Sequence, residues 1–319
     1  EIEKNYKISL DNCSDKNDRI YIFYKLLELS ESTKNYDKAV KYIDEIQTIL
    51  NDQKIDKELL QKWIDYNIDI KNYDKVVELL RDYINRENVL KTKIYYETEL
   101  ANVFLYQEKY KDAKQILERL INEYEENSML KKELGKTYYL LGNTNLEYDW
   151  NFDESKSAYQ ECMNISKTTY YGKESENKIN SITSYLNFQD EIFYITSLVD
   201  DNQVIDDDLL SQPIVVDYNG LDSLIFNSGQ ILYFDLGAKD SALFKFKNIV
   251  SNYPESKFHY KSLLILDMDE PNSNWKNILE SDYGTLDTNE SGMTHIDFLI
   301  DKSWNLLSQS LEVAIDSLL

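Results

Sequence analysis

Apolar residues along the chain recur at the spacing of an α-helix. Between residues 39 and 50, and again between 113 and 120, most of them lie three or four positions apart. They are Ala39, Ile43, Ile46 and Leu50 in the first stretch, and Ala113, Ile116, Leu117 and Leu120 in the second. This spacing places each set on one side of a helix. The sequence therefore predicts amphipathic helices with one side available for a core.

Few residues in the chain break a helix or favour a tight turn. Only 8 Gly and 3 Pro occur among 319 residues, of which 42% are hydrophobic. β-Sandwiches and barrels need many turns, and those turns depend largely on glycine and proline. The composition thus favours an all-α protein in which short polar turns join the helices.

A short polar turn followed by an aromatic residue recurs before several of the predicted helices. The interval from Tyr36 to Tyr73 equals that from Tyr73 to Tyr110, 37 residues in each case. A fourth copy has Phe152 at this position, and a fifth lies at 236–242. An aspartate follows each of the first four aromatic residues, where its carboxylate would meet free amides and the positive end of the helix dipole. These aspartates are Asp37, Asp74, Asp112 and Asp153.

These recurring turns and helix starts resemble the tetratricopeptide repeat family, whose unit is a pair of antiparallel helices of about 34 residues. The best single match runs from Phe226 to Leu266. The phrase from Asn252 to Lys257, with Pro254 ending one helix and opening the next, is similar to repeats of bacterial cell-envelope tetratricopeptide proteins. The resemblance implies an all-α helical-repeat solenoid of antiparallel helix pairs, either as one array or as two arrays joined by an acidic linker.

Changes in composition along the chain predict four segments. They are a polar N-terminal lead or frayed helix at 1–18, a first array at 19–198 ending in an extra helix near 179–198, an acidic linker at 199–221, and a second array at 222–319 closed by capping helices at 294–307 and 311–318. The linker is the predicted hinge, because its acidic residues and Pro213 interrupt the helical pattern. Whether the two arrays form one rigid body stays open at this point.

The charge balance limits the kinds of partner. The chain has 58 acidic and 35 basic residues, so its formal net charge is −23. Such a surface repels nucleic acid and anionic lipids, and it attracts partners that are basic or have neutral apolar faces. Part of the excess charge also serves to keep the chain soluble. No apolar run reaches the roughly 20 residues of a membrane helix. Because the chain starts at Glu1, we expect an upstream segment: a signal peptide, a lipid anchor or a larger parent protein.

Candidate catalytic and metal-binding residues are sparse. The two histidines, His259 and His295, are expected to be structural or exposed. Cys13 and Cys162 match no metal-binding spacing, and whether they pair is left open. The run Asp206–Asp208 lacks the glycine and closing glutamate of a calcium loop. The sequence therefore predicts no enzyme activity, no cofactor and no metal site.

The resemblance places partner binding on the concave face, which the first helix of each pair lines. Helical register assigns nine residues to that face: Tyr21, Tyr24, Glu28, Gln61, Asp65, Tyr95, Thr98, Asn102 and Tyr106. They lack the Lys, Asn and Arg pattern with which some family members grip a C-terminal carboxylate. The hypothesis is that this aromatic and acidic face accepts an extended or helical segment bearing Lys or Arg. In the alternative, the tyrosines only coat an ordinary surface.

These observations together predict a non-enzymatic scaffold or adaptor that binds other proteins. The resemblance of the segment 252–257 suggests a bacterial cell-envelope assembly and a periplasmic or envelope location. Two alternatives are a cytoplasmic peptide-binding regulator and a purely structural subunit of a large complex. The oligomeric state is left open.

Overall fold

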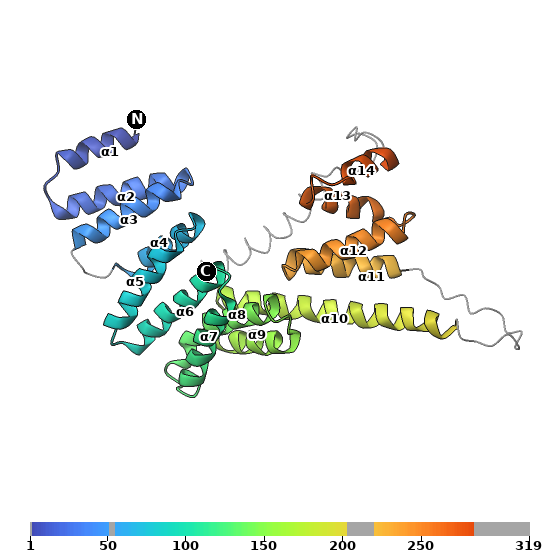
Figure 1. Ribbon diagram of the computed structural model, residues 1–319. Helices are drawn as coiled ribbons and strands as arrows, with labels where there is room; N and C mark the ends of the chain where they lie inside the picture. Colours follow the sequence, from blue (N-terminus) through green and yellow to red (C-terminus); the bar gives the residue numbers. More distant parts are fainter. Residues whose placement is uncertain (1, 51–54, 203–219, 284–319) are drawn as a thin grey trace, which may run out of the picture. The chain divides into compact units, whose positions relative to one another are not determined.

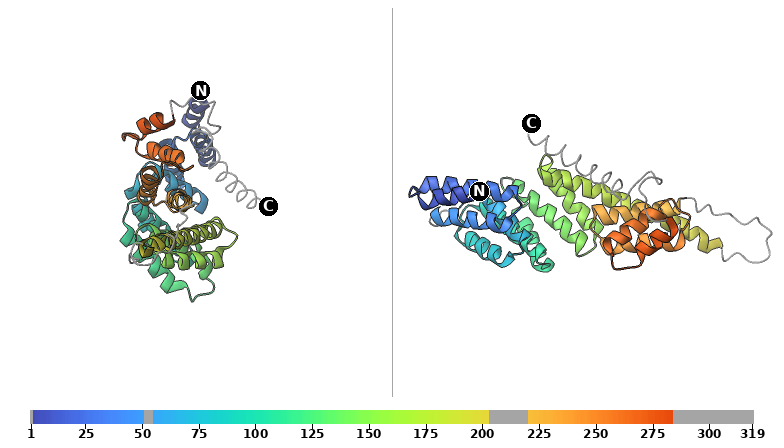
Figure 2. Two further views of the ribbon diagram at one scale, coloured as in Figure 1. Left: turned by 90° about the vertical axis from the view of Figure 1, so that its right-hand side faces the viewer. Right: turned by 90° about the horizontal axis from the view of Figure 1, so that it is seen from above.

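The computed structural model describes residues 2–50, 55–202 and 220–283, with the side chains of 198–202 left aside. Within these ranges the chain forms 14 α-helices and no strand (Figure 1). Successive helices are joined by short turns and pack against each other in pairs, as the turned views in Figure 2 also show. The predicted all-α helical-repeat fold is therefore confirmed.

The contacts divide the chain into two compact units, Glu1–Thr137 and Tyr138–Leu319. The helices of the first unit are α1 (Ile2–Asp11), α2 (Lys16–Ser32), α3 (Tyr36–Leu50), α4 (Lys57–Asp69), α5 (Tyr73–Arg86), α6 (Leu90–Tyr106), α7 (Tyr110–Tyr124) and the short 3-10 helix η1 (Lys131–Leu134). Helix α8 (Gly135–Glu147) begins at the end of this unit. The pairs α2/α3, α4/α5 and α6/α7 are the three repeats that the tyrosine spacing predicts.

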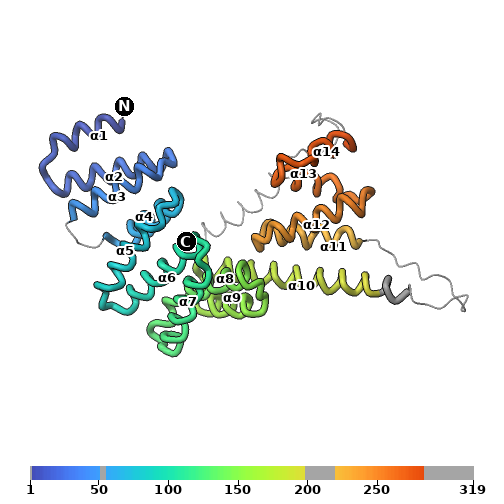
Figure 3. Tube along the Cα trace, in the orientation of Figure 1, coloured from blue at the N-terminus to red at the C-terminus, as the bar shows by residue number. Residues whose placement is uncertain are grey.

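The second unit contains most of α8 and all later helices. These are α9 (Phe152–Ser166), α10 (Tyr170–Asn202), α11 (Leu221–Gln230), the π-helix η2 (Ile231–Asp235), α12 (Lys239–Asn252), α13 (His259–Asp269) and α14 (Trp275–Tyr283). Helix α10 is one continuous helix of 33 residues, and its coloured part can be followed along the Cα trace in Figure 3. The sequence predicts only an extra helix near 179–198, but no helix breaker follows Gly172 in this stretch, and the helix starts earlier.

The predicted turns before the second helices are confirmed, although the capping residues differ. Asp37 and the aspartates equivalent to it lie in the first turns of α3, α5, α7 and α9. The observed side-chain caps instead come from the residue just before the helix. Asn35 accepts a bond from the Lys38 amide at 3.2 Å, and Asn151 accepts one from the Glu154 amide at 3.1 Å. The aspartates are already inside the helix, so they act on its dipole rather than as caps.

Each of these turns contains a residue in the left-handed region, where glycine is normally favoured. Lys34, Lys71, Glu108 and Trp150 have φ values between 52° and 59°. The amide of the next residue then bonds back to the first helix, as from Asn72 to the Asn67 carbonyl at 2.7 Å. The bond closes the turn in the same way in the first three repeats, which share the 37-residue interval, and it spans one residue more before α9, from the Asn151 amide to the Asn145 carbonyl.

The core of each unit comes from the apolar sides of its paired helices. In the first unit the buried set includes Leu27, Ile43, Ile64, Leu80 and Leu117. Leu50 and Ile116, both part of the predicted apolar pattern, are only half-buried. In the second unit one cluster joins residues of α8 to α13, and a smaller cluster is formed by Leu263, Leu264 and Leu279.

Several predicted segments differ in detail from the structure. Residues 2–11 of the predicted lead form α1, none of whose residues is buried. After Pro254 the chain continues through a turn, and α13 begins only at His259, so the proline does not open the next helix. The core cluster of the second unit includes α10 on one side of the predicted linker and α11 on the other. Most of that linker, and the capping helices at 294–307 and 311–318, lie outside the described residues, so the four-segment division stays a prediction.

The candidate chemical residues occupy ordinary structural positions where they are described. His259 is buried, and its Nδ1 is hydrogen-bonded to the Tyr283 hydroxyl at 2.8 Å. Cys13 and Cys162 are both free thiols, and burial raises the pKa of Cys162. His295 and the run Asp206–Asp208 lie outside the described residues.

Candidate functional site

The nine predicted residues lie on three first helices of the first unit: α2, α4 and α6. We call the surface that they share with their neighbours the first-helix face. Tyr21, Glu28, Asp65 and Tyr106 are exposed, and Tyr24, Gln61, Tyr95 and Asn102 are half-buried. Thr98 is 3% exposed, and its hydroxyl is hydrogen-bonded to that of Thr137 at 2.9 Å. Eight of the nine side chains are therefore accessible to a partner, whereas Thr98 belongs to the packing between helices.

A chain of hydrogen bonds links the predicted residues of α4 and α6. The Tyr95 hydroxyl donates to Oε1 of Gln61 at 2.8 Å, and Nε2 of Gln61 donates to Oδ1 of Asp65 at 2.9 Å. Nζ of Lys57 lies 4.3 Å from the centroid of the Tyr95 ring, within the range of a cation–π contact. These contacts hold Gln61 and Tyr95 in fixed positions on the face.

Asp65 and Asp69 form an acidic pair beside a tyrosine. They lie one helical turn apart on α4, and within the described residues neither forms an ion pair. Partial desolvation raises the pKa of Asp65. The hydrogen bond from Gln61 and the charge of Lys136 oppose this increase, and the Asp69 charge adds to it. Burial first, and then the charges of Asp65 and Asp69, raise the pKa of Tyr106. These groups therefore lie in one electrostatic environment, which an incoming cation would stabilise.

The first-helix face also contains residues that the register argument missed. Glu31 accepts hydrogen bonds from Nζ of Lys62 at 3.0 Å and from the Tyr66 hydroxyl at 2.7 Å. Burial and this bond raise the pKa of Tyr66 well above its usual range. Lys136 pairs with the buried Glu99 at 2.7 Å and also lowers the pKa of Asp65. The face is thus aromatic and acidic with interspersed lysines, rather than uniformly acidic.

The α2 part of the face combines exposed and half-buried residues, as the α4 and α6 parts do. Tyr21 is 62% exposed, and Glu28 pairs with Lys25 on the same helix at 2.7 Å. Tyr24 is half-buried, and burial together with the charges of Asp56 and Glu58 raises its pKa. Because the Glu28 charge is already paired, the free negative charge of the face is concentrated on α4.

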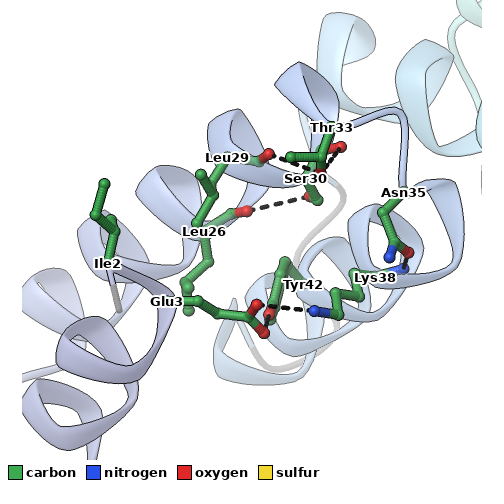
Figure 4. A pocket seen from close by; sticks show the side chains of 9 residues that line it. All are labelled: Ile2, Glu3, Leu26, Leu29, Ser30, Thr33, Asn35, Lys38 and Tyr42. Atoms are coloured by element: carbon green, nitrogen blue, oxygen red, sulfur yellow. Dashed lines mark hydrogen bonds and ion pairs between the residues drawn. The ribbon is translucent and has the colours of Figure 1, made fainter.

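A separate hollow of about 690 Å³ lies between α1, α2 and α3 (Figure 4). Glu3 of α1 reaches across it to Nζ of Lys38 at 2.8 Å and to the Tyr42 hydroxyl at 3.1 Å. The hydrogen bond from Lys38, followed by that from Lys7, lowers the pKa of Glu3 to about 2. The polar groups at its α1 end therefore satisfy one another, and they hold α1 against α3.

Two further properties of the described residues bear on function. No group of three or more His, Cys, Asp or Glu side chains among them is arranged to hold a metal ion. None of the described helices combines the length and the hydropathy that a bilayer-spanning segment needs.

The fold is that of a helical-repeat protein, a class whose repeats generally mediate protein–protein interaction and are typically non-enzymatic. Residues 99–127 match the tetratricopeptide repeat family. The matched segment covers the end of α6 and all of α7, so it includes the third recurring turn. The match supports a tetratricopeptide repeat at this pair of helices.

Comparison with whole proteins adds little beyond the fold. No curated protein matches the chain. Among solved structures, the chain is similar to BtubC (BKLC) from P. vanneervenii, with 11% identity and a TM-score of 0.38. That alignment covers 76% of this chain and 94% of the other. At this level of similarity we transfer no functional property.

Proposed function

We propose that the protein is a non-enzymatic scaffold or adaptor that binds a Lys- or Arg-bearing segment of a partner protein on the first-helix face. The observation that carries this proposal is the pair Asp65 and Asp69, which forms no ion pair within the described residues and lies beside Tyr106. A partner ammonium or guanidinium would neutralise these carboxylates, and the phenol would contact its aliphatic stem.

The raised pKa of Asp65 favours binding of a cation at this position. A raised pKa means that the folded protein disfavours the carboxylate form. Bringing a positive charge to Asp65 reverses that penalty, so part of the cost of placing the carboxylate there is recovered on binding. Gln61 and Tyr95 are already fixed by their hydrogen bonds, and therefore little side-chain entropy is lost at those positions.

The proposed setting is a bacterial cell-envelope assembly, with a periplasmic or envelope location. It is supported by the similarity of the segment from Asn252 to Lys257 to repeats of envelope tetratricopeptide proteins. It is independent of the binding face, so each part of the proposal can fail without the other.

The test is affinity purification of the full-length protein from its native cells at low salt, with mass spectrometry of what is recovered. We expect a fixed set of envelope proteins whose recovery falls at least about tenfold when Asp65→Asn and Asp69→Asn are combined. Tyr24→Ala combined with Tyr95→Ala is expected to weaken recovery as well. Recovery of only cytoplasmic regulators would refute the envelope setting.

A matched control removes the same charge from the second helices. Glu45 and Glu78 lie exposed on α3 and α5, so Glu45→Gln with Glu78→Gln lowers the negative charge equally without touching the first-helix face. This variant is expected to recover the same partners as the unchanged protein. Equal losses in the two double variants would show that only overall charge matters and would overturn the proposed face.

A further inference from the structure

A groove separate from the first-helix face lies on the opposite side of α6. Successive residues of a helix are rotated by about 100° around its axis. Tyr95, Asn102 and Tyr106 therefore lie on one side of α6, while Leu100 and Phe104 lie on the opposite side. The two surfaces share a helix but no side chains, so a ligand can occupy one of them without contacting the other.

Two adjoining hollows form this groove between α5 and α7. Their volumes are about 460 and 320 Å³, and both are lined by Arg81, Ile116 and Arg119. Leu100 and Phe104 of α6 supply apolar surface at its base. Ile116 belongs to the apolar pattern of α7 but is only half-buried, because its side chain faces the groove rather than the core.

Arginine is rare in this chain, and two of its four copies line the groove. Arg119 is held by Glu97, at 3.0 Å, and by Glu123, at 3.3 Å. Arg81 is exposed, and within the described part of the chain its guanidinium forms neither an ion pair nor a hydrogen bond. An arginine without a partner beside an apolar floor offers a bidentate site for a carboxylate.

The charge of the groove contrasts with that of the whole chain. Its lining contains two arginines and two carboxylates, Asp112 and Glu97, so it is formally neutral, whereas the chain carries −23. An acidic ligand is repelled by most of this protein, and here it meets an unpaired cation instead. Apolar surface next to that cation favours a ligand that combines both properties.

We propose that the groove between α5 and α7 binds an acidic and apolar segment of a partner protein. In that segment an Asp or Glu carboxylate contacts Arg81, and a Leu, Ile or Phe side chain within one helical turn of it packs on Phe104 and Ile116. This surface gives the first unit two binding sites of opposite preference on opposite sides of α6.

Random twelve-residue peptides displayed on phage and selected on the full-length protein test this proposal. We expect peptides that combine Asp or Glu with Leu, Ile or Phe to be enriched. The strongest is then synthesised, and its Kd is measured by fluorescence anisotropy. Arg81→Glu is expected to weaken its binding at least about tenfold, because it replaces an attractive charge with a repulsive one. Since Arg81 is exposed and has no described partner, helix content and thermal unfolding should stay unchanged.

Arg86→Glu is the control for charge, because it makes the same charge change on the same helix outside the groove lining; unlike Arg81→Glu, it also removes an ion pair, with Asp82 at 2.8 Å. It is expected to change the Kd by no more than about twofold. Asp65→Asn with Asp69→Asn should leave this peptide's Kd unchanged, which separates the groove from the first-helix face. Acidic peptides that bind the Arg81→Glu variant as well as the unchanged protein would overturn the proposal. Enrichment of basic peptides alone, sensitive to Asp65, would overturn it while supporting the proposed function.

Discussion

The helix pairs of the two units differ where a first helix packs on its second helix. In the second unit a glycine faces an aromatic ring: a Cβ placed on Gly142 would lie 2.5 Å from the Tyr159 ring, and one on Gly229 would lie 3.0 Å from the Phe246 ring. The sequence-equivalent positions of the first unit carry aliphatic residues or alanine. They are Leu27 with Ile43, Ile64 with Leu80, and Ala101 with Leu117, all of them buried. In the second unit, a ring of the second helix fills the space that the side chains of both helices fill together in the first unit.

The turns of the two units also differ in length by one residue. In the first unit the closing bond spans five residues, as from the Asn35 amide to the Ser30 carbonyl at 2.9 Å. In the second unit it spans six, as from the Ala238 amide to the Leu232 carbonyl at 2.8 Å. The π-helix η2 lies at this point and accommodates the extra residue. The turn before α9 also spans six residues, from the Asn151 amide to the Asn145 carbonyl at 2.9 Å, although α8 contains no π-helix.

The largest effect is expected where a glycine of the second unit meets backbone rather than a ring. A Cβ on Gly172 would lie 2.1 Å from the Ser166 carbonyl oxygen, which cannot move without shifting the turn before α10. Gly172→Ala is expected to lower the free energy of unfolding by about 3 kcal/mol. Chemical denaturation measures this change, with the exposed Glu176→Ala on the same helix as the control. Equal stability of the two variants would show that this turn is not tightly packed.

The next largest effect tests whether two kinds of helix packing are interchangeable: a glycine against a ring, and an alanine against a leucine. Gly142→Ala is expected to cost about 2 kcal/mol, because Tyr159 is fully buried and its ring cannot easily move. Adding Tyr159→Leu recreates the Ala101 and Leu117 combination of the first unit. The double variant should then lose at least about 1 kcal/mol less than the sum of the single losses. Strictly additive losses of the free energy of unfolding, measured by denaturation, would show that the two kinds of packing are not interchangeable.

A smaller effect on stability comes from replacing an aspartate with asparagine at pH 7, and it should have opposite signs in the two units. The Tyr233 hydroxyl, first, and Lys239 lower the pKa of Asp269, so its stabilising contribution is present above the ordinary carboxyl pKa and is lost as the pH falls through the lowered value. At pH 7, Asp269→Asn is expected to reduce the free energy of unfolding by about 1 kcal/mol. This difference should diminish in acid.

Asp65 of the first unit provides the opposite case. Its raised pKa means that the free energy of unfolding falls as the pH rises through the range between its unfolded and folded values. Asp65→Asn should therefore raise the stability at pH 7 slightly, by less than about 0.5 kcal/mol, because the side chain is exposed. Thermal unfolding of both variants at pH 4 and pH 7 measures the signs, and a loss of stability at pH 7 in both would contradict them.

The smallest effect concerns the left-handed residue of the turns. Lys71 has a φ of 58°, whereas the second unit has Gly237 with a φ of 74° at the equivalent position. Lys71→Gly is expected to raise the free energy of unfolding by about 0.5 kcal/mol, because glycine adopts this backbone without steric cost. The reverse change, Gly237→Ala, should lower it. A destabilised Lys71→Gly variant would indicate that the lysine side chain contributes more than its strain costs.

The candidate site was predictable in part, because helix register is a local property. The positions of Tyr21, Asp65 and Tyr106 on exposed sides of first helices follow from it. The same spacing extends to Asp69, four residues after Asp65, and to Glu31, three after Glu28, which the sequence argument left out. The burial of Thr98 did not follow from register, since it depends on Thr137 from α8, the first helix of the next pair. The groove between α5 and α7 was not predicted, because the spacing of Ile116 equally fits a core position.

Sequence alone determined that the chain is helical, where the second helices begin, and that they repeat. These features depend on turns and apolar spacing within about ten residues, so they are encoded locally. The tertiary structure decided which residues from different helices meet: Lys136 with the buried Glu99, Gly142 with Tyr159, and Arg81 with the groove beside Ile116. In a stack of repeats, such contacts depend on how neighbouring helices pack rather than on the period within any one of them.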